Sequence, residues 1–227
     1  LQKMNTDTID LIQFHWWDYN NSSYIDALVN LVKLQNEGKI KHIGLTNFDT
    51  ERIKIMTERG FKLISNQVQY SILDQRPEKL MTPFCQKHDI SILAYGTLLG
   101  GFLSERYLNS PESHRADLTT FSLQKYYNII DTWGGWNLFQ ELLQVLSTIA
   151  KKHDSSIANI STKFILDKPA VAGVIIGTRL GLSEHRQDNA HVFNIILDAE
   201  DLAMIHSVTG KSNDLFDAIG DCGDEYR

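Results

Sequence analysis

The chain has 227 residues, of which 42% are hydrophobic and 22% charged, and its formal net charge is −6. These values exclude a disordered or fibrous protein and predict one well-buried domain, residues 1–227. The negative charge and the lack of a long basic run argue against nucleic acid as a partner. No apolar run is long enough to span a bilayer, so we expect a soluble protein that does not bind a membrane.

The cysteine content is low, with only Cys85 and Cys222 in the chain. Two cysteines make no disulfide framework, and they suit a reducing compartment, which favours the cytoplasm. The sequence begins at Leu1 rather than Met and carries no signal-peptide pattern, which leaves open that upstream sequence is missing.

The stretch Ile9–Asp18 opens the chain's predicted secondary structure. Its apolar residues do not alternate with charged ones, which is typical of a strand buried on both faces of a parallel sheet. The apolar run ends at His15, Trp16 and Trp17, where parallel α/β architectures place their chemistry. The structural alternative is that His15 bonds a backbone carbonyl and the tryptophans fill the core.

Units of strand and helix then follow one another along the chain. Gly38 and Gly60 are placed to end two helices, and Asp198 to cap the last one. Further strands are expected within 39–49, 61–68, 90–94 and 172–176, and helices over 24–37, 51–59, 77–87, 122–130, 137–153, 157–167, 183–193 and 200–209. A long insertion or loop, 102–135, interrupts this pattern, and segments of that length are usually functional.

Five strands, each followed by helix, predict an α/β fold with a parallel sheet and right-handed crossovers. A (β/α)8 TIM barrel needs three more such units and about 250 residues. The chain is therefore either an open doubly wound sheet or the C-terminal part of a barrel whose first strands lie outside this sequence.

Polar side chains follow each predicted strand. In a barrel these positions converge on one mouth and line a single pocket. Asn47 as a turn residue and Gln67 as a hydrogen-bonded core amide are the structural alternatives. The clusters are His15; Thr46 and Asn47; Asn66 and Gln67; Tyr95; and Thr178 with Arg179.

Such a pocket offers an imidazole for a carbonyl oxygen, amides for a carboxamide, an aromatic face for a flat ring, and a glycine-rich loop and an arginine for phosphates. The sequence has no Ser-His-Asp order, metal-ligand cluster, Walker A motif or Gly-x-Gly-x-x-Gly fingerprint. Hydride transfer with a nicotinamide bound outside a Rossmann fold fits these groups best.

The sequence resembles the aldo-keto reductase family over essentially its whole length. The segments that carry the resemblance are 10–16, 38–49, 65–71, 93–101 and 175–179, together with 188–189. It implies a TIM barrel in which this chain supplies strands 4 to 8 and their helices. It also implies NADPH-dependent reduction of an aldehyde or ketone, a small-molecule carbonyl substrate, in the intact enzyme.

The resemblance implies roles for individual residues. His15 matches the histidine that orients the substrate carbonyl, and Trp16 and Trp17 belong to the substrate pocket. The pattern near the adenine end favours NADP over NAD. The implied cofactor contacts are Thr46, Asn47 and Gln67 on the carboxamide, Tyr95 on the nicotinamide ring, Gly96, Thr97, Leu98, Gly100 and Gly101 on the pyrophosphate, Thr178 and Arg179 on the 2′-phosphate, and Asp188 and Asn189 on adenine.

The sequence also departs from the family pattern. The family's proton-donating tyrosine, with its aspartate and lysine, belongs to the first three strands, and no residue here matches them, so the chain alone should be a poor reductase. His185 stands where the family often has an arginine, and the loop 179–182 is longer than usual. Two alternatives stay open: a non-catalytic nicotinamide-binding or interaction module that needs a partner, and an open sheet with an unrelated ligand.

Overall fold

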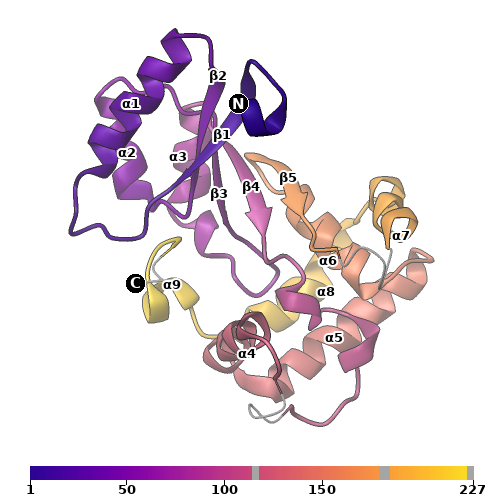
Figure 1. Ribbon diagram of the computed structural model, residues 1–227. Helices are drawn as coiled ribbons and strands as arrows, with labels where there is room; N and C mark the ends of the chain where they lie inside the picture. Colours follow the sequence, from indigo (N-terminus) through magenta and orange to yellow (C-terminus); the bar gives the residue numbers. More distant parts are fainter. Residues whose placement is uncertain (114–117, 179–184, 224–227) are drawn as a thin grey trace.

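The fold is built on one parallel sheet, seen in a computed structural model that describes residues 1–113, 118–178 and 185–223 (Figure 1). Every neighbouring pair of strands is parallel, and the strand order follows the chain, β1-β2-β3-β4-β5. A doubly wound sheet reverses its strand order at a switch point, whereas a barrel adds each strand beside the last. The strands are β1 (Ile9–His15), β2 (Ile40–Thr46), β3 (Ser65–Gln69), β4 (Ser91–Tyr95) and β5 (Val171–Ile175).

Helices connect the strands and follow the sheet. Short 3-10 turns lie at Gln2–Met4, Arg76–Glu78, Leu99–Gly101, Glu105–Tyr107 and His191–Asn194. The α-helices are α1 (Tyr24–Asn36), α2 (Thr50–Glu58), α3 (Met81–Lys87), α4 (Phe121–Trp133), α5 (Gly135–Lys152), α6 (Ile157–Leu166), α7 (Arg186–Ala190), α8 (Ala199–Thr209) and α9 (Leu215–Ile219).

The predicted strand 61–68 is wrong at its start. Gly60 has a φ of +86°, and its N–H donates to the Thr57 carbonyl at 2.9 Å, while the Phe61 N–H donates to the Met56 carbonyl at 3.2 Å. These two bonds form the Schellman motif that closes α2. Phe61 therefore belongs to the end of a helix, and β3 begins at Ser65.

Two predicted helices are shorter than expected. The helix over 77–87 is broken at Leu80, whose φ of −127° separates the turn Arg76–Glu78 from α3. The helix over 183–193 is, within the described residues, the short α7 followed by the turn His191–Asn194. In contrast, α4 is longer than the predicted 122–130, and α9 was not predicted.

The two faces of the sheet differ in how they are covered. Leu45, Val68, Ile92 and Ala94 point to one face and are 0% exposed, as part of a single hydrophobic core, and the equally buried Asn66 lies among them. Residues that alternate with them point to the other face, where most are only partly buried. We call these the covered face and the open face.

The described residues contain neither a membrane-spanning helix nor a metal-ligand cluster. No helix among them is long and apolar enough to cross a membrane. Nor do they bring three His, Cys, Asp or Glu side chains together as metal ligands.

Candidate functional site

Strand register places the predicted tip residues on the open face. His15 lies opposite Thr46, and Thr46 opposite Gln67, so these three side chains form one row across β1, β2 and β3. On β4, Tyr95 lies opposite Gln69 and therefore two residues beyond this row. Because side chains of a strand alternate between faces, this spacing puts Tyr95 on the same face as the row.

Asn47 joins three of these strands at their ends. Its φ of +58° is left-handed, a conformation that asparagine tolerates better than most residues. Its N–H donates to the Gln67 carbonyl at 2.9 Å, and its Oδ1 accepts from the Tyr95 hydroxyl at 2.9 Å. Asn47 is thus a turn residue, and it also brings the predicted amide and ring groups together.

His15 and its neighbouring tryptophans have different surroundings. His15 and Trp17 are both exposed, with ring centroids 6.1 Å apart. Trp16 instead packs against the core rings of Phe14 and Tyr24, and its indole N–H donates to the Asp18 carbonyl at 2.8 Å. The structure therefore gives Trp16 a packing role, while His15 and Trp17 stay accessible.

A cavity of about 600 Å³ lies beside the glycine-rich loop. This volume falls within the range of about 300–1,000 Å³ typical of small-molecule sites. The cavity's lining starts at Gly96, immediately after Tyr95. It includes eight of the predicted cofactor contacts: Gly96, Thr97, Leu98, Gly100, Gly101, Thr178, Asp188 and Asn189.

The glycines of this loop admit a tyrosine from α4. A Cβ on Gly96 would lie 2.5 Å from the Tyr126 hydroxyl oxygen, and one on Gly100 would lie 3.0 Å from the Tyr126 ring. Both glycines also have left-handed φ values, +69° and +65°. Gly101 differs, because nothing lies within 4 Å of where its Cβ would be. Space for a ligand at the backbone is therefore found at Gly101, whereas Gly96 and Gly100 face a side chain.

The long segment 102–135 forms one wall of the cavity, through Ser122 and Tyr126 on α4. Beside them, the Lys125 ammonium lies 5.3 Å from the centroid of the Tyr95 ring and 5.0 Å from that of Tyr126. No residue of α4 was predicted for the site. The i, i+4 spacing of Ser122 and Tyr126 was the available signal, but it could not show which surface the helix faces.

Two polar contacts fix the far side of the cavity. Asn159 is 1% exposed, and its side-chain amide donates to the Asp188 carbonyl at 2.9 Å and to its carboxylate at 3.3 Å. Glu105 accepts the Ile157 N–H at 2.7 Å, which places a carboxylate at the start of α6. Arg179 and the loop 179–182 lie outside the described residues, so the predicted 2′-phosphate contact is represented only by Thr178.

Residues 1–209 of the sequence match the Aldo/keto reductase family. The chain belongs to this family. The family resemblance drawn from the sequence motifs is therefore confirmed, and the parallel sheet agrees with it.

Three curated relatives indicate how much of a family member the chain represents. Flagellar radial spoke protein 5 of Chlamydomonas reinhardtii is 28% identical over 71% of this chain and 34% of its own length. Protein tas of Escherichia coli is 26% identical over 92% of this chain and 64% of its own length. The NADH-specific methylglyoxal reductase of E. coli is 24% identical, with 92% and 61% covered. The chain thus spans from one third to just under two thirds of these relatives.

Solved structures give the same picture of the fold. A glycerol dehydrogenase from Gluconobacter oxydans superposes with a TM-score of 0.76 at 23% identity, covering 92% of this chain and 61% of that one. An aldo/keto reductase from Klebsiella pneumoniae, in complex with NADP and acetate, gives 0.64 at 20% identity, with the same coverage. This likeness supports an aldo-keto reductase arrangement of strands and helices.

Proposed function

We propose that this chain is the part of an NADP-dependent aldo-keto reductase that forms barrel strands 4 to 8, and that the intact enzyme reduces an aldehyde or ketone. The observation that carries the proposal is the shared open face: His15, Thr46, Gln67 and Tyr95 point to it, and the cavity starts at Gly96, the next residue. Two observations support the assignment to strands 4 to 8. The five strands of the sheet are parallel and follow chain order, and the match covers 64% and 61% of two relatives.

The residues present fit a nicotinamide dinucleotide. Asn47 and Gln67 offer amide groups where three strands end, and the bond from the Tyr95 hydroxyl to Asn47 holds a flat ring in place beside them. The cavity extends from this ring to Asp188, with open space at Gly101 for a phosphate. When bound, the nicotinamide supplies the hydride.

The chain's own groups bind and orient the reactants. Asn47 and Gln67 hold the carboxamide and so select which face of the nicotinamide ring is presented. His15 donates a hydrogen bond to the substrate carbonyl, with Trp17 as an exposed wall of the pocket. The acid that protonates the carbonyl oxygen is assigned to strands 1 to 3. Loss of a positioned acid typically lowers a rate by about 10²–10⁴-fold, so this chain alone should be a poor reductase.

The preference for NADP rests on Thr178 and Arg179. Thr178 is exposed and lines the cavity. The names of similar proteins point both ways, since one relative is NADH-specific and one neighbouring structure contains NADP. The choice between the two cofactors is therefore a direct test of the site.

Quenching of tryptophan fluorescence by NADPH and NADH tests the cofactor. We expect tighter binding of NADPH, and we expect Arg179→Ala to weaken NADPH while leaving NADH unchanged. Arg59→Ala, an exposed arginine at the end of α2, is the matched control. Absence of quenching by either nucleotide in a folded sample would remove the cofactor, and equal affinities would remove the 2′-phosphate contact.

A second candidate is the non-catalytic module. Its support is the open face, together with β1 and β5, which border the sheet in the described part of the chain. Exposed strand edges invite pairing with another chain or a second copy. An assay of the protein translated from the gene's longest reading frame separates the candidates. Carbonyl reduction by a longer product supports the enzyme, and an inactive oligomer of this chain alone supports the module.

The cytoplasmic location is part of the same proposal. It is supported by the two cysteines, both of which are buried and neither of which forms a disulfide. A fluorescent fusion located in an oxidising compartment would contradict it.

A further inference from the structure

The chain continues past the family match, which ends at residue 209, and this continuation returns to the strand tips. We call residues 210–222 the C-terminal strap; it contains α9. Figure 1 shows α9, in yellow, on the side where the first strands end. The strap follows α8, and near its start the Asn213 N–H donates to the carbonyl of Trp133, the last residue of α4, at 2.8 Å.

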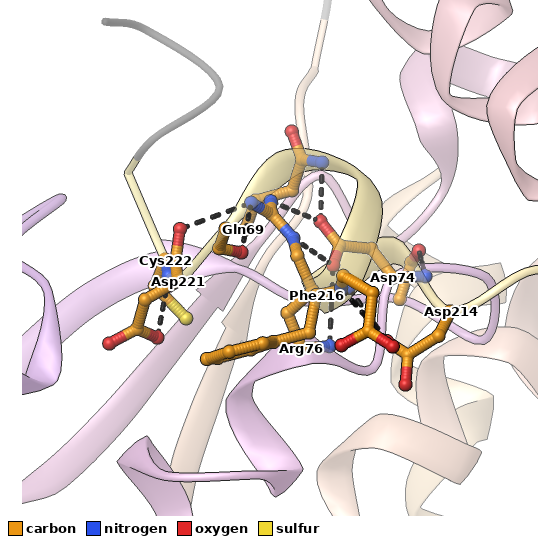
Figure 2. A network of polar contacts seen from close by, with 10 residues as sticks. Gln69, Asp74, Arg76, Asp214, Phe216, Asp221 and Cys222 are labelled. Carbon is orange, nitrogen blue, oxygen red and sulfur yellow. Dashed lines mark hydrogen bonds and ion pairs between the residues drawn. The ribbon is translucent and has the colours of Figure 1, made fainter.

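A buried arginine anchors the far end of the strap (Figure 2). Arg76 is 2% exposed and makes two bonds to the fully buried Asp74 carboxylate, at 2.7 and 2.8 Å. Its remaining Nη1 donates to the carbonyls of Gly220, at 3.4 Å, and Asp221, at 3.2 Å. The charge-assisted, bidentate pair with Asp74 is strong and directional, so it fixes the Arg76 guanidinium, and the two longer bonds from Nη1 hold the strap against it.

The anchor is connected to the sheet. The Gln69 side-chain amide donates to the Asp74 carboxylate at 2.6 Å, and Gln69 is the last residue of β3. In register, Gln69 lies opposite Tyr95. The position of the strap is therefore tied, through three side chains, to the strand that carries Gln67.

Asp221 then contacts the start of α2. Its Oδ2 accepts the Thr50 N–H at 2.7 Å, although the two residues are 171 positions apart. Thr50 is the first residue of α2, and a carboxylate there interacts favourably with the positive end of the helix dipole. The α2 start thus has two acidic partners, its own cap Asp49 and Asp221 from the strap.

Side chains from other elements also hold the corner 47–50. Tyr19 bonds the Asn47 carbonyl at 3.0 Å and the Asp49 N–H at 3.1 Å, and Asn66 donates to the Phe48 carbonyl at 2.8 Å. These partners all come from the first three strand units. The Thr50 N–H is the donor in this corner whose acceptor comes from the strap.

We propose that the strap positions the corner 47–50, so that the Asn47 amide is held for the nicotinamide carboxamide, with Asp221 as the positioning residue and Arg76 as its anchor. This inference rests on the proposed function for the identity of the ligand. The two ends are thermodynamically coupled, because a contact that favours the binding-ready corner must in turn be favoured by the ligand.

Asp221→Ala tests the contact, with Asp217→Ala as the matched control. Asp217 is an acid of the same strap, but it is 75% exposed and pairs with Lys79 away from the corner. We expect Asp221→Ala to raise the Kd for NADPH by about fivefold or more, within the usual range of coupling between sites. Asp221→Asn keeps an acceptor and should restore most of the affinity. An unchanged Kd in Asp221→Ala would overturn the proposal.

Hydrogen exchange without cofactor gives a second readout that does not depend on ligand binding. The amides of 47–50 should exchange faster in Asp221→Ala than in the wild type or Asp217→Ala. Unchanged exchange would mean that the strap does not hold the corner. If the wild type binds no NADPH but exchange still increases, the strap's hold on the corner stands and the proposed function is wrong.

Cofactor protection is the reciprocal experiment. Trypsin can cut after Lys211, whose side chain is 57% exposed at the start of the strap. Saturating NADPH should slow this cut in the wild type and not in Asp221→Ala. Equal cleavage of the wild type with and without NADPH would contradict the coupling.

Discussion

The two faces of the sheet differ in how completely their side chains are buried, and adjacent residues of β4 show the difference. Ile92 points to the covered face and is 0% exposed, whereas Leu93 points to the open face and is only partly buried. Helices complete the core on one face. The other face carries the candidate site, so its side chains are arranged for a ligand or for further strands.

The open face is also polar before the strand tips, as far back as the first residues of β3 and β4. Gln13, Gly44, Ser65 and Ser91 form a row across β1 to β4. The interior of a closed barrel is dominated by bulky branched side chains. The side-chain Oε1 of Gln13 is buried without a hydrogen-bond partner among the described residues.

The largest expected effect compares Ile92→Ala with Leu93→Ala. The first leaves a cavity in a finished core and should cost about 2–5 kcal/mol of unfolding free energy. The second removes a side chain that is still partly in water and should cost about 1 kcal/mol. Urea denaturation of both variants gives the two values. Similar losses would mean that the faces are equally well packed.

Gly44→Ala should be destabilising even though Gly44 lies on the open face, because there is no room for a larger residue there. A Cβ there would lie 2.3 Å from the Ser65 hydroxyl and 2.6 Å from the Gln13 side-chain oxygen. Overpacking of this kind typically costs about 1–3 kcal/mol. Ser65→Ala in the same background removes one of the two clashing atoms. If the double variant is no more stable than Gly44→Ala in thermal unfolding, the crowding is not the cause.

Acid should destabilise both faces together, because the ionic contact involved lies away from the sheet. The Lys152 ammonium, hydrogen-bonded to Asp198, lowers the pKa of that carboxyl from 3.8 to about 2. This contact stabilises the fold above pH 3.8 and is lost as the pH falls through about 2. Thermal unfolding between these values should show a smaller loss in Asp198→Asn. An identical acid profile for that variant would rule out the contact as a source of stability.

The smallest expected effect on stability comes from the Cys85 thiol on the covered side, and thiol labelling measures its accessibility. Burial raises the pKa of Cys85 in α3 from 9.0 to about 12. The buried neutral thiol favours the folded state below pH 9, and that contribution is lost as the pH rises towards about 12. At neutral pH we expect a thiol reagent to label Cys85 only after denaturant is added. Rapid labelling of the native protein would show that the covered side opens.

Much of the sheet could be predicted, because apolar runs and polar strand ends follow directly from a buried parallel sheet. The starts of elements were less certain where a residue served a neighbouring helix, as Phe61 does in closing α2. The strand tips of the site were predictable for the same reason as the strands. The packing of Tyr126 against Gly96 was not, because glycine allows close approach without identifying what approaches.

The strap could not be predicted from local sequence. Its residues are mostly polar, and its defining contact joins Asp221 to Thr50 across 171 positions. No periodicity links two such segments. Only the folded arrangement shows that a carboxylate near the end of the chain serves a helix near its beginning.

Strand order has a consequence for how the protein is made. Each strand pairs with the one synthesised just before it, so the sheet can grow unit by unit as the ribosome delivers it. The Thr50 amide must wait for Asp221, which is translated 171 residues later. A nascent chain halted at residue 209 would therefore contain β1 to β5 and lack the hydrogen bond from Thr50 to Asp221.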